Sequence, residues 1–402
     1  MATDSIFVSK GPAKPFSSRS ERLFGALYGR GEVALHASDD AWLQAMLDVE
    51  AALARACALE GQIPAGAATT IASACESDAF DIAEIGAKAA DSATPVVPLV
   101  DALRELVGGE HARYVHWGAT SQDILDTAAM LIAKRCLGPL LDDARAGADA
   151  AAVFARAHAK TPMAGRTLLQ QALPTSFGLR AAGWLVGIDE TLARLADVGD
   201  TRLAVQMGGA VGSRPPEIAA RVAAELGLAE PTLPWQAMRV RVAELAGALG
   251  ALAGVLAKIA RDVTLLSQSE VGELREGGGA GRGGSSAMAH KRNPVAAISV
   301  IACTTRIPGL VATLLSAMVQ EHERAAGTWQ GEWGTLGELL TLTGSAAAWT
   351  RELLENLEVV PARMLENLAR LAADGVEEAA VPLEHLAGAG MLIERALEAH
   401  RR

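Results

Sequence analysis

The pattern of hydrophobic and polar positions predicts helices along almost the whole chain. Apolar residues recur at helical spacing over about 41–60, 122–137 and 139–160. Shorter helices are expected over 65–107, where prolines interrupt the pattern. No stretch alternates convincingly with the period of two that a strand requires, so the sequence predicts an all-α protein with few strands.

The helix expected over 236–269 has the most regular pattern. Its apolar positions step alternately by four and three residues, which makes a heptad seam of Leu245, Leu249, Leu252, Leu256, Ile259, Val263 and Leu266. Its other faces are largely alanine and glycine, so neighbouring helices should enclose it on several sides. Because aromatic residues are only 4% of the chain, we expect long helices from several subunits to surround it.

The remaining helices are expected over 294–325 and 329–357, with Pro308 kinking the first because it lacks a backbone N–H. From Pro361 onward the pattern indicates two or three short helices. Three domains are therefore expected: an N-terminal helical domain over 1–107, a central long-helix bundle over 108–357 with a catalytic loop at 277–293, and a short C-terminal helical domain over 358–402.

The charge and cysteine content of the chain disfavour several classes of protein function. The net charge of −11 and the pI of about 5.3 lack the basic footprint of a nucleic-acid-binding protein. The four cysteines are far apart, with no CxxC pair, which favours free thiols in a reducing compartment over disulfides or a zinc site. No signal peptide is apparent, and the longest uncharged apolar run, Leu245 to Ala257, is too short to span a bilayer. We therefore expect a soluble cytoplasmic protein with no membrane or nucleic-acid partner.

The segment from Gly277 to Pro294 concentrates candidate chemistry. Six glycines leave its backbone free to bend, and Ser285, Ser286, His290, Lys291 and Arg292 follow them. Asn293 and Pro294 are typical of a helix start, whose free N–H groups suit an anion. The segment also fits GxGxxG, but a helix precedes it rather than a strand, so a dinucleotide site is disfavoured. A plain solvated linker remains the simple alternative.

Two other polar segments could contribute to a site. In the first, Tyr114 to Asp123, the side chains of His116, Thr120 and Ser121 could face a ligand. Alternatively Thr120 or Ser121 only caps the following helix, and His116 only packs beside its tryptophan neighbour. The second, Gly165 to Thr175, could equally be an ordinary loop between helices.

These segments resemble the conserved regions of one superfamily, the fumarase/aspartase lyases. Gly284 to Asn293 resembles the signature GSSxMxxKxN, His116 to Asp123 resembles the first conserved region, and Gly165 to Thr175 resembles the second. The resemblance implies three helical domains and a homotetramer with a twenty-helix core. It also implies active sites that combine the three regions from three subunits, and a reaction without metal or cofactor.

The resemblance also implies residue roles. Ser286 would be the base that exchanges a proton with carbon, and Lys291 and Asn293 would stabilise an aci-carboxylate intermediate. His116 would lie near the substrate, with its proton role open. The other residues expected to bind a small tricarboxylate substrate are Thr120, Ser121, Thr167, Gln170, Ser285, Met288 and Arg324. Three departures from the family are Ala289, where most relatives have proline, Val240, where many have aspartate, and a C-terminal domain that is short for the family.

Leu168 distinguishes between members of the superfamily. Relatives that eliminate an amine or hydroxyl carry histidine at this position, and leucine cannot supply a proton to such a leaving group. A carboxylate, with a pKa of about 4, needs no proton to leave or to attack. The sequence therefore favours the muconate cycloisomerase branch, which closes a lactone within one molecule. An adenylosuccinate-type lyase that releases fumarate and a catalytically silent homologue remain the alternatives.

Overall fold

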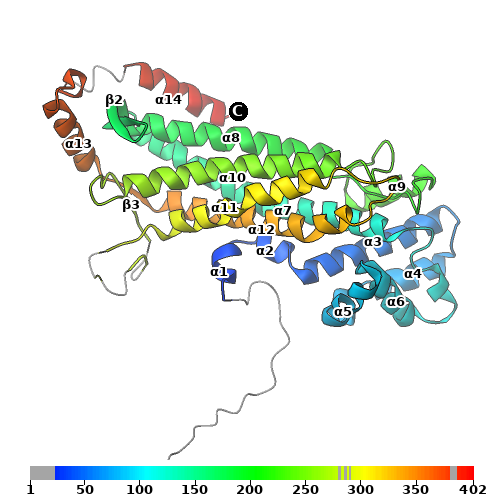
Figure 1. Cartoon of the computed structure of the whole chain (residues 1–402). Helices are drawn as coiled ribbons and strands as arrows, with labels where there is room; N and C mark the ends of the chain where they lie inside the picture. The colour runs from blue at the N-terminus through cyan, green and yellow to red at the C-terminus, as the bar shows by residue number, and fades with distance from the viewer. Residues whose placement is uncertain (1–22, 279–281, 285–287, 289–290, 381–386) are drawn as a thin grey trace, which may run out of the picture.

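The computed structural model describes residues 23–402 except 279–281, 285–287, 289–290 and 381–386. Five long helices lie side by side along one direction and form the central bundle (Figure 1). They are α7 (Ser121–Ala157), α8 (Phe177–Thr201), α10 (Val240–Leu266), α11 (Val295–Ser316) and α12 (Thr328–Glu355). The prediction of an all-α fold is therefore confirmed.

Most of the N-terminal helices gather at one end of the bundle, on the right in Figure 1, while the first two lie beneath its middle. The longest, α3 (Asp39–Leu59), packs against α7 and against α9 (Pro216–Leu226). The shorter elements are α1 (Gly25–Tyr28), α2 (Val33–His36), α4 (Ala65–Ala74), η2 (Ser77–Ala79), α5 (Ile82–Ser92), α6 (Val96–Val107) and η3 (Gly109–Tyr114). The predicted run of short helices over 65–107 is thus confirmed.

Two boundary predictions were wrong. Residues 121–157 form one helix rather than two, because Cys136, Leu137 and Leu140 are buried on either side of Pro139 and packing holds the helix together there. Conversely, α11 ends at Ser316 instead of continuing to 325. The eleven residues between α11 and α12 form a connecting segment, which carries Arg324.

The heptad seam of α10 is buried within this chain. All seven seam residues are at most 3% exposed, because α8, α11 and α12 pack around them. The seam itself is thus covered without a second subunit, while the expectation that helices from several subunits surround the whole helix stays a prediction. The face left exposed is the small one, where Gly247, Ala251 and Gly254 lie.

Two helices in the described part of the chain, α10 and α11, are long and apolar enough to cross a membrane, each with a hydropathy of 1.7. This corrects the expectation that no apolar segment is long enough. In the fold, 50% of the α10 window and 39% of the α11 window are buried inside the chain. Core helices of bundles in water have the same character, so the observation is weak support for a membrane span.

Strands are few among the described residues, as predicted, and they form two antiparallel pairs. The pair β1 (Pro162–Thr167) and β2 (Gln170–Ser176) is a hairpin at the left end of the bundle in Figure 1. The pair β3 (Leu274–Glu276) and β4 (Leu357–Val359) joins the chain after α10 to the chain after α12. The alternative of an ordinary loop for the second polar segment was therefore wrong. Its strands lack an alternating pattern because much of the hairpin faces no core.

The C-terminal segment contains short helices, as predicted. α13 (Pro361–Ala373) packs against β1, and η4 (Glu377–Ala380) follows it. α14 (Ala387–His400) lies along α8 (Figure 1). His400 anchors its end, with Nδ1 3.0 Å from the Asp189 carboxylate and Nε2 2.9 Å from that of Asp149.

Candidate active site

The first region lies at the start of α7. Thr120 is the N-cap residue, as one alternative predicted, and its backbone N–H donates to the Asp123 carboxylate at 3.2 Å. Ser121 is the first helical residue. His116 and Gly118, in the turn before the helix, both have left-handed backbones, with φ of 62° and 66°. This turn places the three predicted residues of the first region together.

Asp123 fixes the turn to the chain segment after α8. Its carboxylate accepts hydrogen bonds from the backbone of Gly208 and Gly209 at 2.9 and 2.8 Å, and from Gln206 Nε2 at 3.1 Å. Burial raises the pKa of Asp123, and these donors oppose the shift. The carboxylate therefore serves as a structural anchor beneath Thr120.

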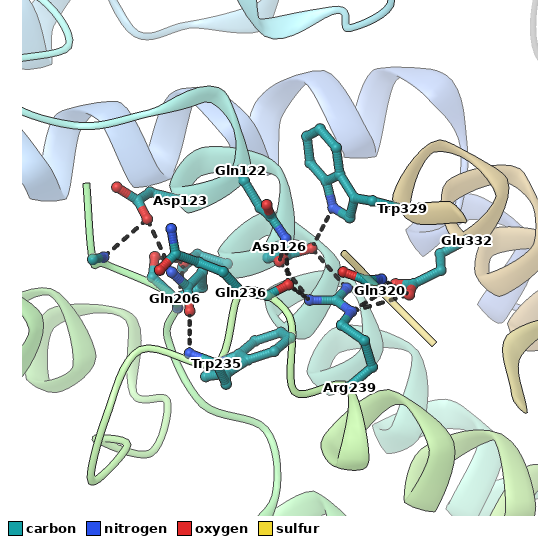
Figure 2. Close-up of polar contacts among 12 residues, drawn as sticks. Gln122, Asp123, Asp126, Gln206, Trp235, Gln236, Arg239, Gln320, Trp329 and Glu332 are labelled. Atoms are coloured by element: carbon teal, nitrogen blue, oxygen red, sulfur yellow. Dashed lines mark hydrogen bonds and ion pairs between the residues drawn. The ribbon is translucent and has the colours of Figure 1, made fainter. Parts of the chain in front are cut away.

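A buried ionic network extends this anchor into the bundle (Figure 2). Arg239 pairs with Asp126 at 2.7 Å and also with Glu332. The network includes hydrogen bonds from Trp329 Nε1 to Asp126 at 2.9 Å and from Gln320 Nε2 to Glu332 at 3.0 Å. It therefore ties α7, α12 and the segment that follows α11 together around one guanidinium group.

Arg239 lies between two acidic side chains, and this arrangement shifts its pKa and that of Glu332. Burial alone lowers the pKa of Arg239, but Asp126 and Glu332 raise it above its ordinary value. Burial also raises the pKa of Glu332, and Arg239 opposes that shift. With two carboxylates as partners, Arg239 has no need of an aspartate at the next position, and Val240 is half exposed there.

Arg324 joins the first region from the segment between α11 and α12. Its Nη1 donates to Thr120 Oγ1 at 2.6 Å, and its side chain is otherwise exposed. The structure thus brings Arg324 together with His116, Thr120 and Ser121. It orients Arg324 through Thr120, and the Gln320–Glu332 hydrogen bond holds the same segment in place.

The third region precedes α11, and its helix start differs from the prediction. The first helical residue is Val295, with Pro294 rather than Asn293 at the N-cap. The Glu276 carboxylate accepts hydrogen bonds from the backbone of Ala296 at 2.8 Å and of Ala297 at 3.3 Å. The hypothesis that these N–H groups bind a substrate anion was wrong, because a carboxylate of the same chain already occupies them.

The loop over 277–293 is closed at its base. Asn293 N donates to Gly283 O at 2.8 Å, and Gly284 forms an antiparallel bridge with Arg292. A Cβ on Gly283, where φ is 69°, would lie 2.4 Å from Asn293 O, so the crossing requires glycine. Arg282 pairs with Glu276 at 3.2 Å and with Glu352, which fixes the first side of the loop.

Lys291 is exposed at this base, Asn293 is half buried, and Met288 is exposed by 44%. Ser285, Ser286, Ala289 and His290 lie outside the described residues, so the predicted proton-transfer serine has no placement here.

The second region is the tip of the β1–β2 hairpin. Thr167 and Gln170 pair across the tip, and both are exposed. The turn between them is Leu168–Leu169, with left-handed φ angles of 51° and 64° and exposures of 96% and 76%. Two-residue hairpin turns of this form usually use asparagine and glycine. One residue before the tip, Arg166 makes two hydrogen bonds to the buried Glu273, at 2.7 and 2.9 Å.

The three regions do not meet within one chain. The first lies where α7 begins, and the hairpin follows the end of α7, whose 37 residues span about 55 Å. The Arg166–Glu273 pair and the β3–β4 pair keep the hairpin and the loop base at the same end of the bundle. His116, Thr120, Ser121 and Arg324 are therefore together at the start of α7, whereas Thr167, Gln170, Lys291 and Asn293 lie with the hairpin and the loop base near its other end.

Sequence reasoning missed two glutamates that hold these regions. Glu276 occupies the start of α11, and the buried Glu50 contacts His116. Glu50 could have been found, because it lies on the apolar face of the predicted helix, one turn after Leu47. A carboxylate on such a face needs a partner. Within the described residues, no group of three His, Cys, Asp or Glu side chains could hold a metal ion.

Comparisons with known proteins define the class. A family model described as "Lyase" matches residues 29–309, which is most of the chain. The chain belongs to this lyase family, the fumarase/aspartase superfamily.

Within the family, the chain is similar to 3-carboxy-cis,cis-muconate cycloisomerase of Bradyrhizobium diazoefficiens, at 47% identity over 82% of this chain and 75% of that protein. It resembles the solved 3-carboxy-cis,cis-muconate lactonizing enzyme of Pseudomonas putida, with a TM-score of 0.87, 35% identity, and coverage of 94% and 99% of the two chains. It is also similar to nitrosuccinate lyase of Streptomyces davaonensis, at 41% identity over 89% of this chain and 80% of that one.

Proposed function

We propose that this protein converts 3-carboxy-cis,cis-muconate into 4-carboxymuconolactone, a step of aromatic catabolism in the cytoplasm. The observation that carries the proposal is the similarity to proteins of that name over most of the chain, at 47% identity to one of them. The similarity to a solved lactonizing enzyme supports it.

The reaction rearranges one molecule. A substrate carboxylate oxygen forms a C–O bond to a double-bond carbon, and the alkene electrons move onto a neighbouring carboxylate as an aci-carboxylate. Lys291 and Asn293 stabilise that charge, and Ser286 then delivers a proton to the adjacent carbon. Because nucleophile and acceptor belong to one molecule, much of the entropic barrier is removed. The remaining predicted residues, including Thr120, Ser121, Thr167, Gln170 and Arg324, bind the substrate carboxylates.

Leu168 supports the choice of a carboxylate nucleophile. It occupies the hairpin tip, where its side chain is 96% exposed and offers no proton. A reaction that expels an amine would lack its acid at this position. Lactone formation needs no such acid, because the attacking carboxylate is already ionised at neutral pH.

The proposed active site is shared between subunits of a homotetramer. In support, the first region and the other two lie at opposite ends of the bundle, so one chain cannot complete the site. A groove of about 450 Å³ runs between α10 and α11 along Gly247, Gly254 and Pro308, leaving a surface of small residues for neighbouring helices. We propose that these faces form the twenty-helix core, with the domains divided at 107/108 and 357/358.

A second candidate is cleavage of nitrosuccinate. The 41% identity to a nitrosuccinate lyase over 89% of the chain favours it. Leu168 is compatible with this reaction as well as with lactone formation, because a group that leaves as a stable anion needs no proton donor.

The test is direct turnover. The purified protein is mixed with 3-carboxy-cis,cis-muconate while the diene absorbance is followed, and parallel reactions contain nitrosuccinate or adenylosuccinate. Loss of the diene signal with formation of the lactone is the expected result. Turnover of nitrosuccinate or adenylosuccinate, with no decrease in the diene absorbance of 3-carboxy-cis,cis-muconate, would overturn the proposal. The mass in solution should be that of a tetramer, and a monomer would contradict the shared site.

A further inference from the structure

A buried carboxylate, that of Glu50, contacts His116 in the first region. Glu50, on α3, places Oε1 2.5 Å from His116 Nδ1. The glutamate side chain is 0% exposed and the histidine side chain 14% exposed. The contact joins residues 66 positions apart and is the point at which α3 meets the turn before α7.

The contact determines which histidine nitrogen is available. An ionised carboxylate can only accept, so Nδ1 must carry the hydrogen that joins the two groups. No described residue forms a hydrogen bond with Nε2, while the ring keeps a partly exposed edge. In either charge state of the ring, Nε2 is therefore the nitrogen presented toward a ligand.

Among the described residues, the Glu50 carboxylate forms a hydrogen bond only with His116. Its second oxygen, Oε2, is buried and has no hydrogen-bond partner among the described residues. A buried carboxylate that only stabilised the fold would normally be saturated by several donors, as Asp123 is. Leaving one oxygen unpaired is costly, which favours a functional reason for Glu50.

The backbone around His116 supports the same view. His116 has a φ of 62°, and few side-chain-bearing residues adopt this conformation unless their surroundings enforce it. Gly118 follows with a φ of 66°, and a Cβ there would lie 3.3 Å from Arg214 Nη1. The turn is thus held in an uncommon shape in which the imidazole ring reaches the α3 carboxylate.

A guanidinium also lies on this side of α3. Arg214 donates from Nη2 to Cys57 Sγ at 3.0 Å, and Cys57 is on the same helix as Glu50. Burial raises the pKa of Cys57, Arg214 lowers it, and Glu50 raises it, so both charges act on this thiol. Arg214 and Glu50 therefore both lie close to Cys57 on the α3 side of His116.

We propose that Glu50 is a positioning residue that holds His116 through Nδ1 and directs Nε2 toward the substrate. This inference rests on the proposed function for the identity of the substrate, but the Glu50–His116 geometry does not depend on it. In the assembled site, the oriented Nε2 would meet the substrate beside Thr120 and Ser121. Glu50 itself would not touch the substrate.

The first measurement needs no substrate. The chain contains eight histidines, so uniform ¹⁵N-histidine labelling and the His116→Gln variant assign the His116 signals in the native protein. We expect Nδ1 to carry the hydrogen. In Glu50→Gln, the amide can donate to Nδ1, and part of the population should shift to the tautomer with hydrogen on Nε2. A native ring protonated only on Nε2 would overturn the proposal even if the variant failed to fold.

The second measurement uses activity. Glu50→Gln should lower kcat/KM by about 10²-fold, the low end of the contribution expected from a positioned acid–base group. The matched control is Asp48→Asn on the same helix, whose carboxylate pairs with Arg135 at 2.6 Å. The control should stay within about twofold of native, because this part-buried ion pair includes none of the predicted site residues. Equal losses in both variants would show a structural role and overturn the proposal.

A double variant tests whether Glu50 and His116 act together or contribute to activity independently. If Glu50 acts through His116, the variant Glu50→Gln/His116→Gln should lose no more activity than His116→Gln alone. Losses that multiply would overturn the proposal. Failure of the proposed function gives a different pattern: the native protein would not consume 3-carboxy-cis,cis-muconate, while the tautomer shift in Glu50→Gln would persist.

Discussion

The two ends of the bundle are built differently. At the His116 end, buried charges tie the bundle helices to their connecting segments: Asp123 holds the segment after α8, and Arg239 joins Asp126 to Glu332. At the other end, Thr167 and Gln170 lie on an exposed hairpin tip, and Lys291 lies at the base of a glycine-rich loop. The first end is preorganised within one subunit, whereas the second presents its groups outward. Under the proposed shared site, precise positioning comes from one subunit and the reactive groups come from its neighbours.

The largest expected effect tests this division directly. Ser286→Ala should lower kcat by up to about 10⁴-fold through loss of the proton donor, and His116→Gln should also be strongly impaired. Mixed after dissociation and reassembly, the two inactive variants should recover activity, because some sites would combine native regions from different subunits. Activity measured before and after mixing checks this. No recovery from tetrameric mixtures would contradict a shared site.

The second largest effect is expected on the free energy of unfolding, at the His116 end of the bundle. Arg239→Met leaves Asp126 and Glu332 buried without their cation, which should lower the free energy of unfolding by about 3–5 kcal/mol. Urea unfolding measures this. The control is Arg241→Met, two residues later, whose exposed guanidinium donates to the Arg202 carbonyl and should cost less than about 1 kcal/mol. Similar losses for both variants would remove the contrast between the two ends.

A smaller effect is expected at the loop end. Glu276→Gln weakens the interaction with the α11 N-terminus and the pair with Arg282, and should lower stability by about 1–2 kcal/mol. Hydrogen exchange at Ala296 and Ala297 should accelerate, while exchange at Gly208 and Gly209 stays unchanged. Equal acceleration at both places would indicate global rather than local loosening.

The smallest effect concerns pH. Burial lowers the pKa of His158, at the turn that precedes β1. The unfolded chain then binds more protons between about pH 6.5 and the lowered pKa, so native stability should fall as the pH falls through that window. His158→Gln should reduce this dependence by less than about 1.4 kcal/mol, the equivalent of one pKa unit. Unfolding midpoints measured on both sides of pH 6.5 test the sign, and an unchanged slope would contradict it.

Local patterns predicted the bundle well because burial follows helical periodicity. The seven seam residues of α10 were identified by spacing alone, and all are buried. The predicted break near residue 138 is absent, since the packing of the surrounding α7 residues outweighs the local cost of Pro139. The hairpin was missed because Leu168 and Leu169 occupy left-handed positions that rarely take leucine.

The sequence predicted those features of the site that depend on one continuous segment. The composition of the region around Asn293 suggested an anion site, but whether the helix start was free depended on Glu276, seventeen residues earlier. Likewise His116 was found by its motif, whereas its partner Glu50 comes from another helix. Such pairings depend on tertiary contacts, which no local pattern specifies.

The hairpin tip has a consequence for how this protein family can diversify. Leu168 and Leu169 lie outside the hydrophobic core of their own chain, so replacing them removes no buried contact within it. Selection can therefore change the chemistry at this position, for example by introducing an acid for a different leaving group, with little effect on whether the subunit folds. The tip is a part of the scaffold where new reactions can arise without compensating mutations elsewhere.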